Sequence, residues 1–195
     1  MNIFDIHIKN GEIIDGTGAP KFKSDIVIDK GKIIGVFPPE NGDVRDPSEN
    51  HFLSNFSAKN IIDAENKIVS PGFIDVHTHD DDNVFIDPSM SSKISQGVTT
   101  CVAGNCGISL APFSYKGEVP APIALLGKSE AFRFPRVSDY REEFIDKPSS
   151  VNLALLTGHS MLRVEAMNGE FDRAATSKEI YKMVDKLKLA LEDGS

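Results

Sequence analysis

The chain has 195 residues, of which 40% are hydrophobic and 26% charged, a composition typical of a globular protein with a buried core. Its net charge of −8 and the lack of any run of Lys or Arg exclude nucleic acid as an expected partner. An anionic substrate would need local cations at its site, because the overall charge repels it.

The beginning of the sequence and its cysteines indicate the compartment. The first residues carry no cationic segment followed by an apolar run, so no signal peptide is expected. No stretch reaches the ~20 apolar residues needed to cross a bilayer, so no membrane segment is expected either. Cys101 and Cys106 are the only cysteines, and two cysteines this close do not indicate a disulfide framework. We therefore expect a cytoplasmic protein.

Residues 1–67 are predicted to form a small antiparallel β domain. Alternating or β-branched apolar runs predict strands at residues 4–8, 12–15, 25–29, 32–36, 61–64 and, at the boundary, 67–69. Asn10-Gly11 is typical of a hairpin turn, and Lys30-Gly31 is expected to connect the next pair of strands. Residues 38–60, rich in Pro, Ser and Asn, lack periodicity and are predicted to be an irregular loop.

From residue 68 to residue 195, strands alternate with helix-like segments. The pattern predicts strands at residues 72–76, 98–103 and 151–156, and helices at residues 88–96 and 176–191. The last helix has an apolar stripe made of Ile180, Val184, Leu187 and Leu191. At its start, Thr176 and Glu179 fit a capping box. Strand–helix alternation of this kind predicts parallel βαβ units and an α/β fold.

Two histidines follow directly after the first of these strands. Side chains alternate along a strand, so His77 and His79 are expected on one face, together with Asp75. At the carboxyl end of a parallel strand, where α/β proteins place their sites, two imidazoles on one face can bind one metal ion. The alternative is a pair of surface histidines in a loop. The run Asp80-Asp81-Asp82 that follows is predicted to be a solvated turn.

Several motifs resemble one enzyme family. Residues 71–79, PGFIDVHTH, resemble the first-strand signature of the amidohydrolase superfamily. Residues 14–18, 96–100, 104–112 and 154–163 resemble its D-aminoacylase, or N-acyl-D-amino-acid deacylase, branch. The His-x-His pair specifies only the superfamily, whereas Gly104-Asn105-Cys106-Gly107 is more specific to the branch. The resemblance covers nearly the whole chain, except the loop at residues 38–60.

The resemblance implies a metal-dependent (β/α)8 TIM barrel that follows a small antiparallel β-sandwich domain. Such a barrel takes about 250 residues, so residues 68–195 are expected to supply only its first strand–helix units. We therefore expect the barrel to be incomplete in this chain, as in a fragment or a split gene, with a separate chain as one source of the remaining strands. A non-enzymatic remnant that acts as a binding module is the alternative.

The resemblance also implies an activity and a cofactor, namely zinc-dependent hydrolysis of the amide bond of N-acyl-D-amino acids. In this family the cysteine that matches Cys106 helps to hold a tight zinc site, and the histidines that match His77 and His79 serve a second, weaker one. The family's proton-transferring aspartate lies beyond residue 195, so the isolated chain is expected to be inactive. The alternative enzyme is a hydrolase of cyclic amides, such as a hydantoinase or a dihydroorotase; those branches use a carboxylated lysine.

Other polar residues allow two interpretations each. Cys106, in a turn after the second strand, is either a metal ligand or a structural thiol, and Cys101, inside the strand, fits the structural role. Asp75 either orients an imidazole or belongs to a polar patch. His159, at the end of the third strand, is a candidate for contact with substrate or with a ligand, with a structural hydrogen bond as the alternative. Arg163 is expected to be solvated or in a salt bridge rather than to hold a substrate carboxylate.

Overall fold

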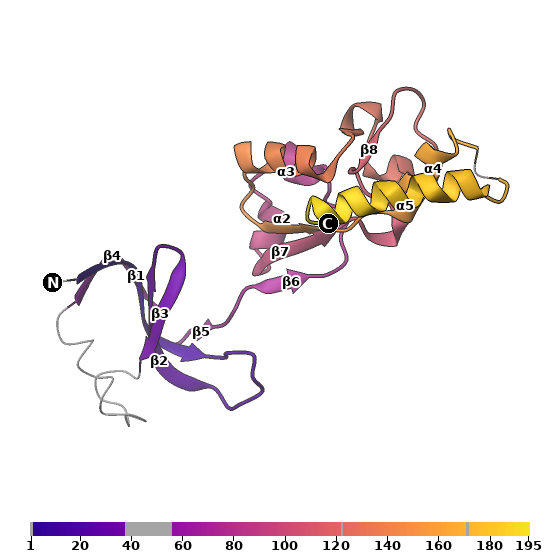
Figure 1. The fold of residues 1–195 in the computed structure, drawn as a ribbon. Helices are drawn as coiled ribbons and strands as arrows, with labels where there is room; N and C mark the ends of the chain where they lie inside the picture. Colours follow the sequence, from indigo (N-terminus) through magenta and orange to yellow (C-terminus); the bar gives the residue numbers. More distant parts are fainter. Residues whose placement is uncertain (1, 38–55, 122, 171) are drawn as a thin grey trace. The chain divides into compact units, whose positions relative to one another are not determined.

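The computed structural model describes residues 2–37, 56–121, 123–170 and 172–195 (Figure 1). The chain divides into two compact units, Met1–Pro71 and Gly72–Ser195. The boundary was expected after residue 67. Strand β5 (Ile68–Val69) pairs with the first strand of the chain, so its residues belong to the first unit.

The first unit is a mixed β-sheet with the strand order β3-β2-β1-β4, and β5 also pairs with β1. The longer strands are β1 (Asn2–Ile13), β2 (Phe22–Asp29), β3 (Lys32–Phe37) and β4 (Phe56–Asp63). β1, β2 and β3 pair antiparallel, but β4 and β5 run parallel to β1. The prediction of a purely antiparallel domain is therefore wrong.

The two predicted turns of this unit have different outcomes. Lys30 and Gly31 both have positive φ and connect β2 to β3, as the sequence predicts. Asn10-Gly11 forms no hairpin, because β1 runs through it with a shift of register, and Asn10 has a φ of 61°. These residues form a bulge. A Cβ atom on Gly11 would lie 2.7 Å from Val69 Cγ2, so the glycine lets β5 approach β1.

The predicted loop at residues 38–60 overlaps a strand. Residues 56–60 belong to β4, so that part of the prediction is wrong, and residues 38–55 lie outside the described residues. The described residues of this unit form a single sheet, and the second layer of a sandwich is not found among them. The buried cluster is small, with Phe4 and Val27 at its centre and Phe56 packed against them.

The second unit is α/β, as expected. Its parallel sheet has the order β10-β7-β6 and consists of β6 (Phe73–Asp75), β7 (Val98–Ala103) and β10 (Asn152–Leu155). These strands lie where the sequence predicts them. Within the described ranges the sheet stays open and does not close into a barrel. A separate antiparallel pair is formed by β8 (Phe113–Ser114) and β9 (Arg133–Phe134).

Helices and short 3-10 turns lie between these strands and, in α4 and α5, after the last of them (Figure 1). The helices are α1 (Asn83–Ile86), α2 (Ser91–Ile94), α3 (Val137–Asp146), α4 (His159–Ala166) and α5 (Ser177–Glu192). The 3-10 turns are η2 (Asn105–Gly107), η3 (Ile123–Leu126) and η4 (Ser129–Ala131). The predicted helix at residues 88–96 is thus confined to α2. None of the helices in the described part of the chain is long and apolar enough to cross a membrane.

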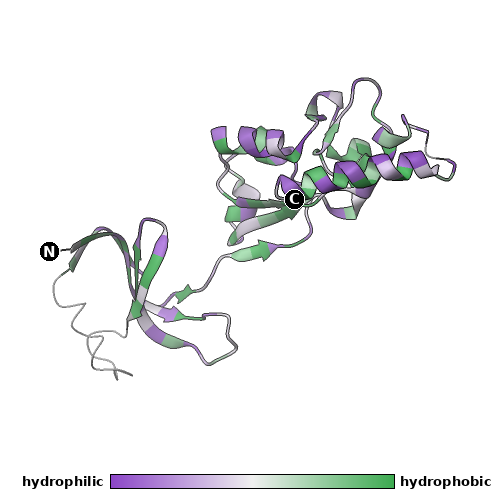
Figure 2. Cartoon of the chain, viewed as in Figure 1, coloured by the Kyte–Doolittle hydropathy of each residue, from purple (hydrophilic) through white to green (hydrophobic). Residues whose placement is uncertain are grey.

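The main core of the second unit takes side chains from β7, from β8 and β9, and from α1, α3, α4 and α5. Cys101 is fully buried in it, which confirms its structural placement. Tyr140 packs edge-to-face against Phe85 and Phe134. Figure 2 shows hydrophobic and hydrophilic residues side by side along α3 and α5, as expected for helices with one buried side.

Helix α5 begins as predicted but packs on a different face. The Thr176 side chain accepts a hydrogen bond from the Glu179 amide, and the Glu179 carboxylate accepts one from the Thr176 amide. The predicted stripe stays at least 37% exposed, whereas Met183 and Ala190 are buried. Met183 packs beside residues of α4 in a small cluster. The side of α5 that faces α4 is therefore the side of Met183 and not the predicted stripe.

Candidate metal centre

The segment after β6 is fastened to the end of β7 through Thr78. The Thr78 amide and hydroxyl both donate to the carbonyl oxygen of Val102, at 3.0 and 3.1 Å. Thr78 is almost fully buried, whereas its neighbours His77 and His79 are exposed and half-buried. The central residue of the His-Thr-His run is therefore the anchor. Its anchoring leaves both imidazoles free to serve as ligands.

Cys106 lies in a tight turn after β7. Gly104, Cys106 and Gly107 all have positive φ, at 81°, 56° and 77°. The left-handed region is unfavourable for a residue with a side chain, by about 1–2 kcal/mol, so the turn holds the cysteine in a strained conformation. The Asn105 amide group donates to the Val102 carbonyl at 2.7 Å and to the Thr78 carbonyl at 3.4 Å. Asn105 thus fastens the cysteine turn to the histidine segment.

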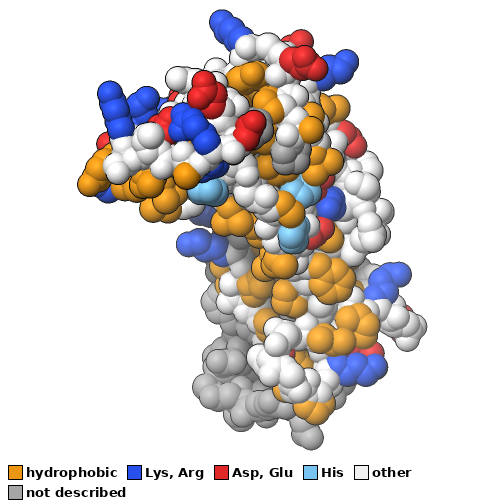
Figure 3. Space-filling model, turned by 90° about the vertical axis from the view of Figure 1, so that its right-hand side faces the viewer, with side chains coloured by type: hydrophobic (Ala, Val, Ile, Leu, Met, Phe, Trp, Pro, Cys, Tyr) orange, Lys and Arg blue, Asp and Glu red, His pale blue; other side chains and the backbone are white. Residues whose placement is uncertain are grey.

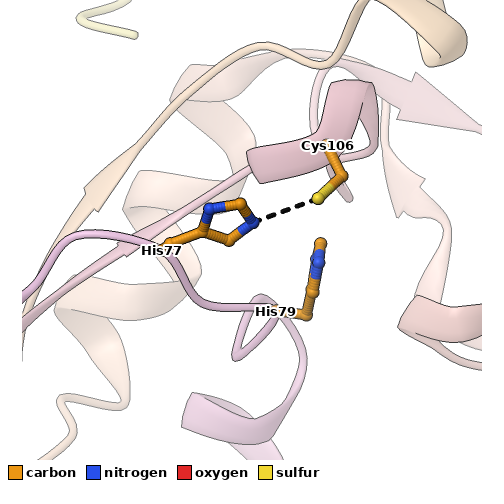
Figure 4. A group of neighbouring side chains, drawn as sticks. All are labelled: His77, His79 and Cys106. Carbon is orange, nitrogen blue, oxygen red and sulfur yellow. Dashed lines mark hydrogen bonds between the residues drawn. The ribbon is translucent and has the colours of Figure 1, made fainter.

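The three predicted ligands converge (Figure 4). His77 Nε2 lies 3.0 Å from Cys106 Sγ, and one ligand atom from each of His77, His79 and Cys106 lies within 4.8 Å of the others. The two imidazole rings are 5.9 Å apart between centroids and nearly perpendicular. Figure 3 shows histidine side chains at the molecular surface next to hydrophobic ones. His77 and Cys106 are both exposed, so ions can reach the cluster from solvent.

The donor set fits a zinc ion. Zinc takes thiolate sulfur and imidazole nitrogen at about 2.0–2.3 Å in tetrahedral sites. The Nδ1 atom of His79 is buried and has no hydrogen-bond partner within the described structure, which is unfavourable for a polar atom unless a ligand satisfies it. No other group of three potential ligands of this kind is found in the described ranges. The geometry therefore supports the metal prediction and disfavours two unrelated surface histidines.

Asp75 is held by a lysine and not by an imidazole. Its carboxylate accepts hydrogen bonds from Lys93 Nζ at 2.8 Å and from the backbone amide of His77 at 3.4 Å. Lys93 also pairs with Asp80 at 3.0 Å. The hydrogen bond to Lys93 lowers the pKa of Asp75, and the same bond, with the pair to Asp80, raises the pKa of Lys93 to about 12. Asp75 therefore belongs to a polar patch with Lys93 and Asp80.

The acidic run 80–82 is not a solvated turn, and that prediction is wrong. Asp81 is fully buried, and burial raises its pKa to about 6. Its carboxylate accepts hydrogen bonds from the amides of Gly104 and Leu110, and its carbonyl accepts one from the Tyr140 hydroxyl at 2.6 Å. The sequence offered one signal for Asp81, because it continues the two-residue step of His77 and His79.

His159 and Arg163 are not members of the three-residue group. His159 is the exposed first residue of α4. Arg163 donates a hydrogen bond to the carbonyl of Arg173 at 2.5 Å. A role for His159 at the site thus stays a prediction, and Arg163 has a structural contact.

Comparison with known proteins identifies the family of the chain. Residues 60–192 match the model of the amidohydrolase family (Amidohydro_3). The D-aminoacylase of Alcaligenes xylosoxydans xylosoxydans is 39% identical over 192 residues, which cover 98% of this chain and 36% of that protein. The chain thus spans about a third of the length of the curated relatives it matches.

Two solved structures are similar over nearly the whole chain. A structure of D-aminoacylase, described as having a binuclear metal centre with one-metal activation and second-metal attenuation, is 44% identical with a TM-score of 0.85, covering 98% of this chain and 37% of that one. N-acyl-D-glutamate deacylase from Bordetella bronchiseptica, complexed with zinc and a phosphonate inhibitor, is 39% identical with a TM-score of 0.81, covering 97% and 36%. The chain therefore belongs to the amidohydrolase family and resembles its D-aminoacylase and N-acyl-D-amino-acid deacylase members.

Proposed function

We propose that this chain carries part of the metal site of a zinc-dependent deacylase that hydrolyses the amide bond of N-acyl-D-amino acids. The convergence of His77, His79 and Cys106 carries the proposal, because these residues offer one thiol and two imidazoles within 4.8 Å. The similarity to a zinc-bound deacylase and to D-aminoacylase supports the metal and the substrate class. The Cys106 thiol favours the deacylase class over the cyclic-amide hydrolases. The family resemblance implies that those hydrolases use a carboxylated lysine as the bridging ligand.

Each residue of the proposed site has one task. Zinc supplies Lewis-acid chemistry in such sites, which activates water and polarises the amide carbonyl. His77, His79 and Cys106 would hold the ion, and Cys106 must lose its thiol proton to do so. Thr78 and Asn105 keep the two ligand segments in register through the Val102 carbonyl. The polar patch of Asp75, Lys93 and Asp80 fixes the backbone that leads into His77.

We further propose that hydrolysis needs residues outside these 195, supplied by further sequence or by a separate chain. The resemblance assigns the proton-transferring aspartate to a later strand, and the matched relatives are about three times as long. The 195-residue chain is therefore expected to bind metal but to release no amino acid from N-acetyl-D-amino acids. Turnover by the purified 195-residue chain would contradict this.

The cysteine pair gives a matched test of the metal site. Cys106→Ser should lower the zinc content of the purified chain, measured by mass spectrometry of the metal, far more than Cys101→Ser does. Cys106 is exposed at the cluster, whereas Cys101 is buried in the core. Equal losses of zinc in the two variants would remove Cys106 from the ligand set.

The substrate class needs a separate assay. A protein that also contains the rest of the relatives' length should release free amino acid from N-acetyl-D-amino acids but not from the L isomers, and it should leave hydantoins intact. Preferential opening of hydantoins would instead favour the cyclic-amide alternative.

A further inference from the structure

Asp81 lies two residues after His79 and contacts the loop that carries Cys106. Its carboxylate is fully buried, and within the described ranges it is not part of any ion pair. We propose that Asp81 is a positioning residue that sets the location of the Cys106 sulfur relative to the two histidines. The proposal rests on the metal site proposed above, which Asp81 would support without being a ligand.

The two carboxylate oxygens bracket the cysteine loop. Oδ2 accepts a hydrogen bond from the amide of Gly104 at 3.5 Å, just before Cys106, and Oδ1 accepts one from the amide of Leu110 at 3.3 Å, just after it. One side chain thus contacts both ends of the loop. Both amides are buried, so each needs an acceptor that water cannot provide.

The backbone of Asp81 is fixed to the hydrophobic core through Tyr140. The Asp81 carbonyl accepts a hydrogen bond from the Tyr140 hydroxyl at 2.6 Å, and the Tyr140 ring is packed against Phe85 and Phe134. The backbone of Asp81 is therefore restrained by Tyr140 while its side chain contacts the loop. His79 precedes this anchored point by two residues, so the anchor also constrains the histidine segment.

The loop is also confined by close backbone contacts with Leu156 and Gly158. A Cβ atom on Gly104 would lie 2.0 Å from the Leu156 carbonyl oxygen, and one on Gly158 would lie 2.6 Å from the Gly107 carbonyl oxygen. Between these contacts and Asp81, the loop has little freedom to shift. The sulfur of Cys106 is thereby held near His77 before any metal binds.

A buried carboxylate is an unfavourable choice for stability alone. An apolar side chain of similar volume would avoid the desolvation of a charge, and no lysine or arginine of the described ranges forms an ion pair with Asp81. The carboxylate is useful here because it can accept two amide hydrogen bonds at once. An amide side chain cannot accept through both of its terminal atoms as Asp81 does, since its nitrogen is a donor.

A double-mutant cycle with Co²⁺ as the probe tests the proposal in the 195-residue chain. Asp81→Asn should weaken Co²⁺ binding by about tenfold, the lower end of the effect of residues that orient metal ligands. It should also weaken the near-ultraviolet charge-transfer band of the thiolate–Co²⁺ bond. Asp82→Asn, which changes the adjacent carboxylate beside Arg133, is the control and should leave both readings within about twofold.

The cycle is completed in the Cys106→Ser background. If Asp81 acts through Cys106, then Asp81→Asn should change Co²⁺ affinity there by less than about twofold, because the interaction it supports is already absent. Equal losses in the two backgrounds would overturn the proposal and leave Asp81 with a structural role only.

Two further measurements keep the result decisive. If Asp81→Asn fails to fold, Tyr140→Phe removes only the hydroxyl that anchors Asp81, and the same cycle applies to it with a smaller loss. If the unmodified chain binds no Co²⁺, the proposed metal site fails by itself. Amide hydrogen exchange at Gly104 and Leu110 then decides the role of Asp81, and unchanged exchange in Asp81→Asn would overturn it.

Discussion

The sheet of the first unit consists mostly of long strands, whereas the sheet of the second unit is short and surrounded by long connections. β1, β2 and β4 have 8 to 12 residues each, but β6 and β10 have only 3 and 4. The first unit has a small buried cluster and the second a large one. Backbone ladders thus dominate the first unit, and side-chain packing dominates the second.

Buried polar side chains differ in the same way. In the described part of the first unit the buried polar residue is Ser24, inside a strand. In the second unit Thr78, Asp81 and Ser109 are buried in connections that follow strands, and each hydrogen-bonds to the backbone. These side-chain hydrogen bonds hold the irregular connections in place, as backbone hydrogen bonds between strands hold a sheet. The candidate metal centre lies where such connections meet.

The largest effect should come from the core of the second unit. Phe113→Ala removes a ring that is 1% exposed and packs against Phe132 and Tyr115. We expect a loss of about 3–5 kcal/mol in the free energy of unfolding by urea. Ile33→Ala in the first unit, where Ile33 is 65% exposed, should cost no more than about 0.5 kcal/mol. Similar losses at both positions would contradict the contrast in packing.

A pair of glycines compares the two units at nearly equal φ. Gly104 and Gly16 have φ values of 81° and 82°, but only Gly104 is in close contact, with Leu156. Gly104→Ala should cost about 2–4 kcal/mol, from the left-handed conformation and from overpacking together. Gly16→Ala should cost only the conformational part, about 1–2 kcal/mol. Equal losses in thermal unfolding would mean that the cysteine loop is not confined.

The cap of α5 should have a smaller effect. Thr176→Ala removes the hydroxyl that accepts from the Glu179 amide and should cost about 1 kcal/mol. Ser177→Ala, one residue further and exposed, is the control and should change stability little. The difference between the two variants in the free energy of unfolding by urea would measure the contribution of the Thr176 cap to the stability of α5. No difference would assign the stability of α5 to packing alone.

The smallest effect is expected from an ion pair, and it depends on pH. The Arg136 guanidinium lowers the pKa of Asp193 to about 2, below the ordinary value of 3.8. The folded state then binds this proton less readily than the unfolded state, so the pair stabilises the fold above about pH 4 and loses its contribution as pH falls toward about 2. Asp193→Asn should therefore destabilise the protein at neutral pH and converge with the unmodified chain near pH 2. A constant difference across this range would contradict the assignment.

Much of the second unit follows from the sequence. The three parallel strands and the start of α5 rest on local patterns, which a sequence displays directly. The meeting of His77, His79 and Cys106 is expected from the rule that parallel strands end at one edge, together with the family resemblance.

Features that depend on distant partners could not be predicted. Asn10-Gly11 is typical of a hairpin, but pairing of β1 with three other strands turns it into a bulge. The face on which α5 packs is set by α4, which buries Met183 and leaves the Ile180 side of the helix exposed. Burial of Asp81 requires Gly104, Leu110 and Tyr140 at once, and no local rule brings these together.

The unequal exposure of the two thiols has a practical consequence. Cys106 is open to solvent and Cys101 is fully shielded inside β7. A maleimide reagent should therefore attach once to the folded metal-free chain and a second time only when β7 opens. The number of labels per molecule, read by mass spectrometry over time, then reports the opening of the central strand from the two natural cysteines alone.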